Sequence, residues 1–400
     1  MAIAVRGITR SEMEQYEASA MRTFGADVAE GESRLAKVLQ TERAYAAFDG
    51  DELVGTAGAF EHTLSVPGGS LPMAGLTFVS VLPSHRRRGV LRALMAKHED
   101  DMVAHQEAVS GLWASESSIY GRFDYGVAAE AHYLETDART LRFPTDFTPD
   151  AVRFVESQQA LAKIAPLYES AFPQRPGMFL RTEAWWNSRT LYDGPGRRGS
   201  GSNVRIATAQ RDGKPVGYIL YRQTAANDRG LLDGAVSIVE LVGLDLQAEQ
   251  SLWHFIAHLD LYPHLKYWNA PLDSALPWFV EDRRRVQRLR TDTLWLRLRD
   301  VPAALEARTY ACDGSLPIKL QGEPDAGCNL RVTNGRASCV TGPADGGITL
   351  HRKDLASLFL GGFRPSELAA VGRLEGSPEM LLHADALFGG TRAPWCPEIF

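Results

Sequence analysis

One segment combines the residue types that hold phosphate groups. Residues 78–95 (FVSVLPSHRRRGVLRALM) begin as an apolar strand, pass through a loop with three arginines and a glycine, and continue as an amphipathic helix. The first N–H groups of a helix have no partner inside the helix, and the helix dipole favours an anion there. Arginine side chains add charge-assisted hydrogen bonds, and Gly89 lets the backbone approach a pyrophosphate closely. The segment therefore predicts a phosphate-binding turn, with an exposed basic helix start as the alternative.

The same segment carries a resemblance to a known family. Residues 79–91 resemble the acetyl-CoA signature, Arg/Gln-x-x-Gly-x-Gly/Ala, of the GNAT superfamily of N-acetyltransferases, with Leu91 where that signature usually has Gly or Ala. Residues 114–126 (ASESSIYGRFDYG), the chain length, a doubled domain and the C-terminal Phe400 are similar to the Eis (enhanced intracellular survival) branch of that superfamily. This resemblance covers essentially the whole chain. It implies two acetyltransferase-type domains and a sterol-carrier-like domain, assembled as a homohexamer.

The resemblance also implies an activity and a set of residue roles. The activity is acetyl-CoA-dependent transfer of acetyl to primary amines of aminoglycosides, as in antibiotic resistance, or of polyamines or lysine side chains. The strand edge at Val79, Ser80 and Val81 would hold the acetyl group and the pantetheine. The phosphates would be held by the turn and the helix start, at Arg86, Arg87, Arg88, Gly89, Val90, Leu91 and Arg92. Ser115 and Glu116 would lie near the cofactor, Tyr120 would be the general acid, and the carboxylate of Phe400 the general base.

Simple acid–base chemistry is consistent with these two catalytic roles. A free amine has a pKa near ~10.4, so a base must take a proton before or during attack on the thioester. Strand N–H groups can stabilise the tetrahedral intermediate, and a phenol of pKa ~10 can protonate the departing thiolate of pKa ~8.5. A terminal carboxylate is a weak base in isolation, and burial or a relaying water would assist it. The neighbouring His85 is interpreted as a solvated loop residue.

The chain contains one pattern twice. Val54-Gly55 and Val216-Gly217 each sit in the second strand of a predicted hairpin and lie 162 residues apart, and further landmarks recur at nearly the same offset. The second copy lacks the phosphate turn, because residues 244–249 (LDLQAE) contain no glycine or arginine. Asp245 and Glu249 would repel phosphates. We expect the second copy to keep the scaffold without binding the cofactor.

These patterns predict an α/β (α+β) protein of three domains. The expected boundaries are 1–148 for a catalytic, acetyl-CoA-binding domain, 149–290 for a degenerate second copy, and 291–400 for the sterol-carrier-like domain whose C-terminus completes the active site. The tail from residue 391 has no helix or strand signal, and its two prolines favour an extended arm.

Composition excludes several classes of function. A formal net charge of −6 disfavours nucleic-acid binding. The longest uncharged apolar run, residues 71–83, is shorter than the ~20 residues that a membrane-spanning helix needs. No secretory signal is visible, which favours the cytoplasm. Four cysteines (Cys312, Cys328, Cys339 and Cys396) fit no zinc pattern, so we expect free thiols and no metal.

Two acidic residues are candidates for binding the acceptor, and one other class of function remains open. Asp27 and Glu398 could attract polycationic amines at the acceptor side, with a merely solvated acidic loop as the alternative. The rival to an enzyme is a non-catalytic scaffold or carrier that binds CoA or a lipid.

Overall fold

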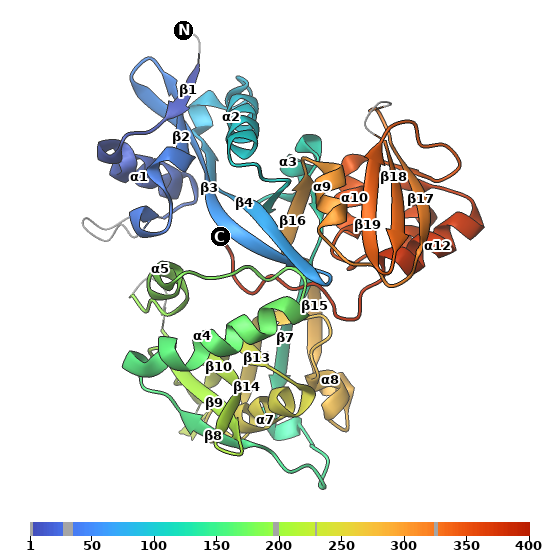
Figure 1. Ribbon diagram of the computed structural model, residues 1–400. Helices are drawn as coiled ribbons and strands as arrows, with labels where there is room; N and C mark the ends of the chain where they lie inside the picture. The colour runs from blue at the N-terminus through green and yellow to red at the C-terminus, as the bar shows by residue number, and fades with distance from the viewer. Residues whose placement is uncertain (1–2, 27–34, 195–199, 229, 324–326) are drawn as a thin grey trace.

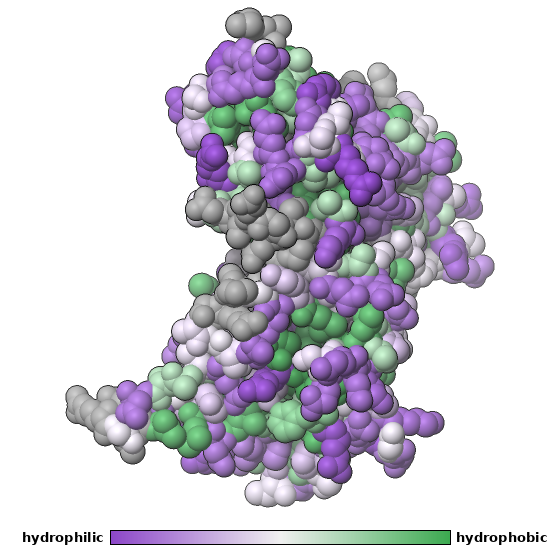
Figure 2. Space-filling view, turned by 90° about the vertical axis from the view of Figure 1, so that its left-hand side faces the viewer, coloured by the Kyte–Doolittle hydropathy of each residue, from purple (hydrophilic) through white to green (hydrophobic). Residues whose placement is uncertain are grey.

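The computed structural model describes residues 3–26, 35–194, 200–228, 230–323 and 327–400. Three α/β units surround the last residues of the chain, whose end lies between the first unit and the second (Figure 1). Figure 2 shows the side on which α1 and α5 lie, with hydrophilic and hydrophobic residues interspersed and a narrowing between the first and second units. No helix in the described ranges is long and apolar enough to cross a membrane.

The first sheet has the strand order β1-β2-β3-β4-β5-β16-β6. Its strands are β1 (Ala4–Gly7), β2 (Ala44–Asp49), β3 (Glu52–Val66), β4 (Gly69–Val81), β5 (Val109–Trp113), β16 (Leu294–Leu298) and β6 (Gly126–Val127). The helices of this unit are α1 (Met13–Thr23), α2 (Val90–Ala104) and α3 (Ser117–Tyr120).

Both faces of this sheet are covered. Successive side chains of a strand point to opposite faces, and in β2 Ala44 and Ala46 join the core with Met13 and Tyr16 of α1, whereas Tyr45 packs with α2. The two helices therefore cover opposite faces. This explains why β2 is an almost continuous apolar run rather than an alternating one.

The second sheet repeats this plan, with the order β15-β7-β14-β13-β10-β9-β8. Its strands are β15 (Gln287–Asp292), β7 (Glu130–Asp137), β14 (His264–Pro271), β13 (Ala235–Gly243), β10 (Lys214–Thr224), β9 (Arg205–Arg211) and β8 (Ala151–Phe154). The helices are α4 (Ala160–Ala171), α5 (Glu183–Trp185), α7 (Leu246–Ala257) and α8 (Leu276–Phe279), and a π-helical turn, Trp186–Thr190, follows α5.

The third unit is a smaller sheet with the order β19-β18-β17-β20-β21. Its strands are β17 (Gly314–Leu320), β18 (Cys328–Thr333), β19 (Arg336–Thr341), β20 (Ile348–Leu350) and β21 (Leu374–Glu375). Its helices are α9 (Val301–Glu306), α10 (Arg352–Leu358), α11 (Pro365–Ala370) and α12 (Pro378–Phe388). The hydrophobic core of this unit is continuous with the α1 side of the first sheet.

The sheets do not follow the expected boundaries at 148/149 and 290/291. β7 precedes residue 148 but pairs with β14 and β15 in the second sheet. β16 follows residue 291 but lies between β5 and β6 in the first sheet. Each sheet thus includes a strand from beyond its expected segment. A strand's local pattern carries no information about such a distant partner, which is why the sequence did not predict the exchange.

All four cysteines carry free thiols, as expected. Cys328, Cys339 and Cys396 are buried and Cys312 is half-buried.

Candidate active site

A β-bulge interrupts β4 in the segment predicted to hold the acetyl group. Thr56 of β3 pairs with Ser80, but Gly58 pairs with Thr77, so Phe78 and Val79 together oppose a single residue of β3. Phe78 has φ +52°, in the left-handed region. A bulge leaves a residue outside the regular ladder and changes the direction of its backbone groups. Backbone N–H groups of this segment can therefore face a ligand instead of β3.

The hydroxyl of Thr56 fixes the bulge. It donates to the carbonyl oxygen of Phe78 at 2.6 Å and lies 2.7 Å from the Ser80 hydroxyl. The Ser80 side chain is therefore engaged with β3 and buried. Any contact of Ser80 with the cofactor would come from its backbone.

The strands β4 and β5 separate beside this bulge. They pair in parallel only from Met73 to Gly75 on β4 and from Val109 to Gly111 on β5. β4 continues to Val81 and β5 to Trp113 with no further pairing between them. An unpaired strand edge can bind an extended ligand through its main chain, as in β-augmentation. This edge is where an amide-containing arm such as pantetheine would fit.

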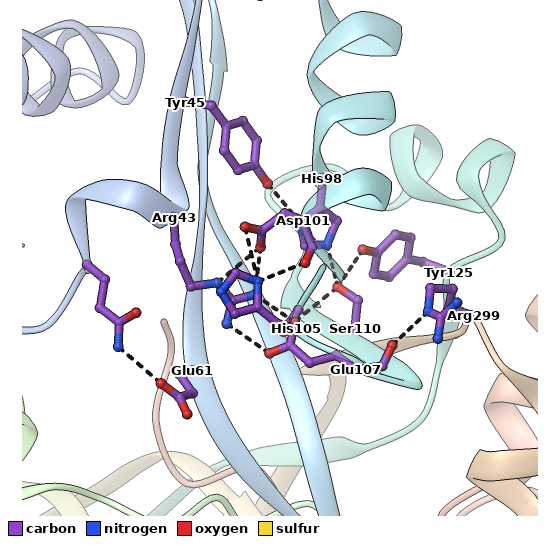
Figure 3. Close-up of polar contacts among 12 residues, drawn as sticks. Arg43, Tyr45, Glu61, His98, Asp101, His105, Glu107, Ser110, Tyr125 and Arg299 are labelled. Atoms are coloured by element: carbon purple, nitrogen blue, oxygen red, sulfur yellow. Dashed lines mark hydrogen bonds and ion pairs between the residues drawn. The ribbon is translucent and has the colours of Figure 1, made fainter. Parts of the chain in front are cut away.

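A buried polar network holds the two strands at the point where they separate (Figure 3). Ser110 of β5 donates to the carbonyl oxygen of Ala74 at 3.0 Å and lies 2.7 Å from the Tyr125 hydroxyl and 2.8 Å from Nε2 of His98. Nδ1 of His98 is 2.8 Å from the Tyr45 hydroxyl. Burial lowers the pKa of His98 to about 3, so this histidine is neutral near pH 7. A satisfied buried network of this kind makes the local geometry rigid.

The predicted phosphate turn has the backbone geometry that anion binding needs. Gly89 is the N-cap of α2 with φ +84°, and the first hydrogen bond of the helix runs from Ala93 N–H to the Gly89 carbonyl at 3.0 Å. The N–H groups of the three residues before Ala93 therefore point out of the helix end. The side chains of the three arginines before Gly89 are exposed. Arg88 is held by Asp49 at 2.9 Å.

His85 corrects one expectation. It is buried rather than solvated, with Nδ1 2.9 Å from the Ser84 hydroxyl and Nε2 3.3 Å from the carboxylate of Asp49. Asp49 thus contacts both His85 and Arg88, at the two ends of the arginine run. The contact with Asp49 explains the burial of His85. Because Asp49 is the last residue of β2, it also connects the turn to the end of that strand.

A pocket of about 480 Å³ lies next to the bulge and contains both predicted catalytic residues. Four of the site residues predicted from the sequence line this pocket, namely Val79, Ser115, Tyr120 and Phe400. The remaining lining residues had no predicted role: Glu17, Met21, Phe24, Leu35, Val38, Leu76, Thr77, Phe78, Trp113, Ala114, Ser188, Arg189 and Ile399. Ser188 and Arg189 come from the second unit, and no local motif marked them.

Tyr120 ends α3 and is 5% exposed. Burial raises the pKa of Tyr120 to about 12, and this effect outweighs the opposing effect of a hydrogen bond with Ser115. The phenol therefore keeps its proton at neutral pH and can donate it. Its ring packs edge-on to Tyr125, with centroids 6.0 Å apart, so the polar network fixes the ring from behind.

Phe400 is 8% exposed and lies in an aromatic cluster. Its ring centroid is 5.1 Å from that of His62 and 5.6 Å from that of Phe179. Gly75 makes room for it, because a Cβ there would lie 3.3 Å from the Phe400 ring and 2.6 Å from His62. The tail before Phe400 contains neither helix nor strand, as expected.

The remaining predicted site residues lie around or outside the pocket. Arg86, Arg87 and Arg92 are exposed, while Val90 and Leu91 pack into the α2 core. Glu116 is exposed at the start of α3, and Val81 is half-buried. Asp27 lies outside the described residues. Glu398 is 9% exposed, and the partners of its carboxylate are protein groups, namely Arg181, Trp185 and Thr190. This burial favours a positioning role for Glu398 over contact with an amine.

Comparison with protein families and known proteins agrees with this geometry. Residues 4–128 and 177–299 each match the acetyltransferase (GNAT) domain, and residues 301–397 match the sterol carrier protein domain. An uncharacterised N-acetyltransferase of Streptomyces avermitilis is 36% identical, over 100% of both chains. The N-acetyltransferase Eis of Mycobacterium tuberculosis is 36% identical over 348 residues, which are 85% of this chain and 84% of that protein.

A solved structure extends the similarity to the arrangement of all three units. Eis1 from Mycobacterium abscessus aligns with a TM-score of 0.86 at 28% identity, covering 99% of this chain and 100% of that one. The predicted fold class, two acetyltransferase-type domains followed by a sterol-carrier-like domain, is confirmed.

Proposed function

The chain belongs to the Eis family of GNAT N-acetyltransferases, and we propose that it transfers acetyl from acetyl-CoA to a primary amine by direct attack in the pocket that contains Tyr120 and Phe400. One observation carries this proposal. A buried, protonated phenol and the end of the sequence line one pocket, beside a bulged strand edge with open backbone groups.

The residues present fit acetyl-CoA as the acetyl donor, which GNAT acetyltransferases use. The start of α2 offers outward N–H groups after a left-handed glycine, and exposed arginines flank it. These groups would hold the phosphates. The unpaired edge of β4 from Leu76 to Val81 would pair with the pantetheine amides and lead the thioester to the bulge.

Each catalytic group has one task in this mechanism. In a protein that ends at Phe400, the terminal carboxylate accepts the amine proton, directly or through a water, as the nitrogen attacks the thioester carbonyl. Backbone N–H groups at Phe78 and Val79 stabilise the negative charge that develops on the carbonyl oxygen. Tyr120 then donates its proton to the departing sulfur. No covalent bond to the protein forms.

The acceptor is proposed to be a primary amine of a polyamine, an aminoglycoside or a lysine side chain. Glu17 places an acidic residue in the pocket wall, and Asp27 follows α1 in the sequence. The apolar side chains around Glu17 suit the methylene groups of such amines. Homohexameric assembly and a cytoplasmic location are further predictions from the family resemblance.

An amine panel tests this function. We expect free CoA thiol to appear when the protein is mixed with acetyl-CoA and spermidine, kanamycin or a lysine peptide, with acetylated product by mass spectrometry. Tight CoA binding without turnover on any of these amines would instead support the non-catalytic carrier.

A further inference from the structure

The second sheet separates in the same way as the first. β13 and β14 pair in parallel only from Ala235 to Ile238 and from His264 to Tyr267, and then diverge. The equivalent gap in the first sheet is the proposed cofactor cleft. In the second sheet, Leu241 donates its N–H to the Tyr267 hydroxyl across this gap at 3.2 Å.

The turn of the second unit is rebuilt around internal contacts. Asp245 caps α7 and binds Arg211 at 2.7 Å. Glu249 accepts from Ala275 N–H at 2.7 Å, and burial raises its pKa. The two acidic residues that replace the phosphate turn are therefore structural.

The chain's own tail occupies the second cleft. Trp395 is 2% exposed, its N–H donates to the Pro176 carbonyl at 2.8 Å, and its Nε1 donates to the Asn269 carbonyl at 2.9 Å. Asn269 in turn donates to the carbonyl of Cys396 at 2.9 Å. Only about 40 Å³ remains open beside Trp395, room for a few water molecules.

A second attachment follows three residues later. The Glu398 carboxylate accepts from Nε1 of Trp185 at 3.0 Å and from the Thr190 hydroxyl at 2.8 Å, and it lies 3.2 Å from Arg181. All three partners belong to the second unit. Arg189 of the same unit donates to the carbonyl of Ile399 at 2.9 Å.

Arg181 is a rigid anchor. Its side chain has no exposed surface, lies over the rings of Tyr168 and Trp186, and forms a bidentate pair with Glu240 at 2.6 and 3.0 Å. A guanidinium held on three sides has little freedom, so the carboxylate that it contacts is fixed in place.

We propose that the second, cofactor-free domain positions the catalytic base: Trp395 in its cleft anchors the tail, and the Arg181–Glu398 pair sets the register of Phe400. This inference rests on the proposed function, in which the Phe400 carboxylate is the base. Glu398 lies two residues before Phe400, and an extended chain advances ~3.3–3.6 Å per residue. A slip of one residue at Glu398 would thus move the carboxylate out of hydrogen-bond reach of the amine. Arg181 and Glu398 are positioning residues, since they act through the tail.

The test separates positioning from folding by a matched pair of variants. Glu398→Gln and Asp150→Asn each neutralise one buried carboxylate of an arginine pair, with Arg181 and with Arg211 respectively, but only the first touches the tail. We expect Glu398→Gln to lower kcat about 10²-fold, the typical effect of a misplaced catalytic group, with the Kd for acetyl-CoA unchanged. Asp150→Asn should retain kcat. Equal kcat in the two variants would overturn the proposal.

Two further measurements test the positioning role if Glu398→Gln folds poorly. Trp395→Phe keeps the aromatic packing but loses the hydrogen bond to Asn269, and it should also lower kcat without changing the Kd. In a protein that lacks Phe400, Glu398→Gln should have no additional effect on kcat, because no base remains to be positioned. A further loss there would mean that Glu398 has another role, which overturns the proposal.

Deletion of Phe400 separates the positioning role of the second domain from the proposed function on which that role rests. Full turnover after deletion of Phe400 alone would show that the Phe400 carboxylate is not the base, which rejects the proposed function. Loss of turnover on that deletion, with full turnover in Glu398→Gln and Trp395→Phe, would leave the proposed function intact and reject only the positioning role of the second domain.

Discussion

Trp113 and Trp268, each the fifth residue of its strand, pack against one another with ring centroids 5.7 Å apart. Trp113 is in β5 and Trp268 in β14, the strands that diverge from β4 and β13. The contact therefore joins equivalent positions of two copies of one fold. The tail passes beside both, since Nε1 of Trp113 donates to Sγ of Cys396 at 3.4 Å and Asn269, next to Trp268, holds Trp395. The tail connects the filled cleft of the second domain to the open cleft of the first.

The phosphate turn gives the first prediction. Gly89→Asp places a Cβ at φ +84°, where an L-residue is strained, and adds a negative charge where phosphates would bind. Arg87→Glu reverses a charge in the same turn. Both changes should raise the KM for acetyl-CoA at least tenfold in steady-state assays. Arg336→Glu, an exposed change in the third unit, is the control and should leave that KM unchanged. Unaltered acetyl-CoA affinity by calorimetry in both turn variants would contradict the assignment.

The second prediction concerns Tyr120. Tyr120→Phe removes the proton donor together with its hydrogen bond to Ser115, and it keeps the edge-on packing on Tyr125, which does not involve the hydroxyl. General acids typically contribute ~10²–10⁴-fold, so kcat should fall within that range while the Kd for acetyl-CoA stays constant. Tyr125→Phe, which loses the bond to Ser110 instead, serves as the comparison and should affect kcat less. A kcat near that of the unmodified enzyme would reject the role.

The third prediction is a loss of stability in acid. Burial lowers the pKa of both His62 and His98 to about 3, whereas unfolded histidines titrate near ~6.5. Below pH 6.5 the unfolded chain binds protons that the folded chain does not, so stability is present above pH 6.5 and falls as the pH drops toward 3. Each histidine contributes about 1.4 kcal/mol per pH unit in that window.

Thermal unfolding at pH 7.5 and pH 5 checks this sign. Nε2 of His62 has no hydrogen-bond partner among the described residues, so His62→Leu removes the titration without breaking a bond. It should reduce the difference in Tm between the two pH values. The exposed His351→Leu should leave the difference as it was. A difference that His62→Leu does not alter would refute the linkage.

The fourth prediction concerns a buried ion cluster under the first sheet (Figure 3). Arg43 is fully buried and binds Asp101 and Glu107, each at 2.6 Å. Arg43→Met would leave two carboxylates without their cation, which typically costs about 3–5 kcal/mol for a buried pair. We expect a large fall in Tm. Arg6→Met breaks an exposed pair with Glu12 and should change Tm little. Similar Tm values for the two variants would contradict the claim that the buried ion pairs contribute more to stability than the exposed pair.

Local signals were sufficient to predict the duplicated fold and the turn. The repeated Val-Gly pairs mark real equivalence, because a Cβ on Gly55 would lie 2.9 Å from the Ser80 carbonyl and one on Gly217 2.8 Å from the Val242 carbonyl. Both glycines permit the same close approach of two strands. The helix that begins after Gly89 was also predicted, because a helix start after a glycine depends on neighbouring residues.

Features formed by distant parts of the chain could not be predicted. The exchange of β7 and β16 depends on pairing between strands far apart in sequence. Nothing near Arg181 in the sequence indicates that it lies 3.2 Å from the carboxylate of Glu398. The burial of His85 depends on Asp49, at the end of a strand in a different part of the sequence. In each case the residue that determines the outcome is close in the folded structure but distant in the sequence.

The most direct test of the account is kcat for amine acetylation in three proteins: one that ends at Phe400, one that lacks Phe400, and one extended by a single glycine. Deletion or extension moves the terminal carboxylate by ~3.3–3.6 Å, beyond hydrogen-bond reach of the same amine or water. Phe400→Leu keeps the carboxylate in place and should retain much of the activity. The account predicts that kcat falls at least about 10²-fold in the shortened and extended proteins, with Tm and acetyl-CoA affinity nearly unchanged. Full turnover in either of them would contradict it.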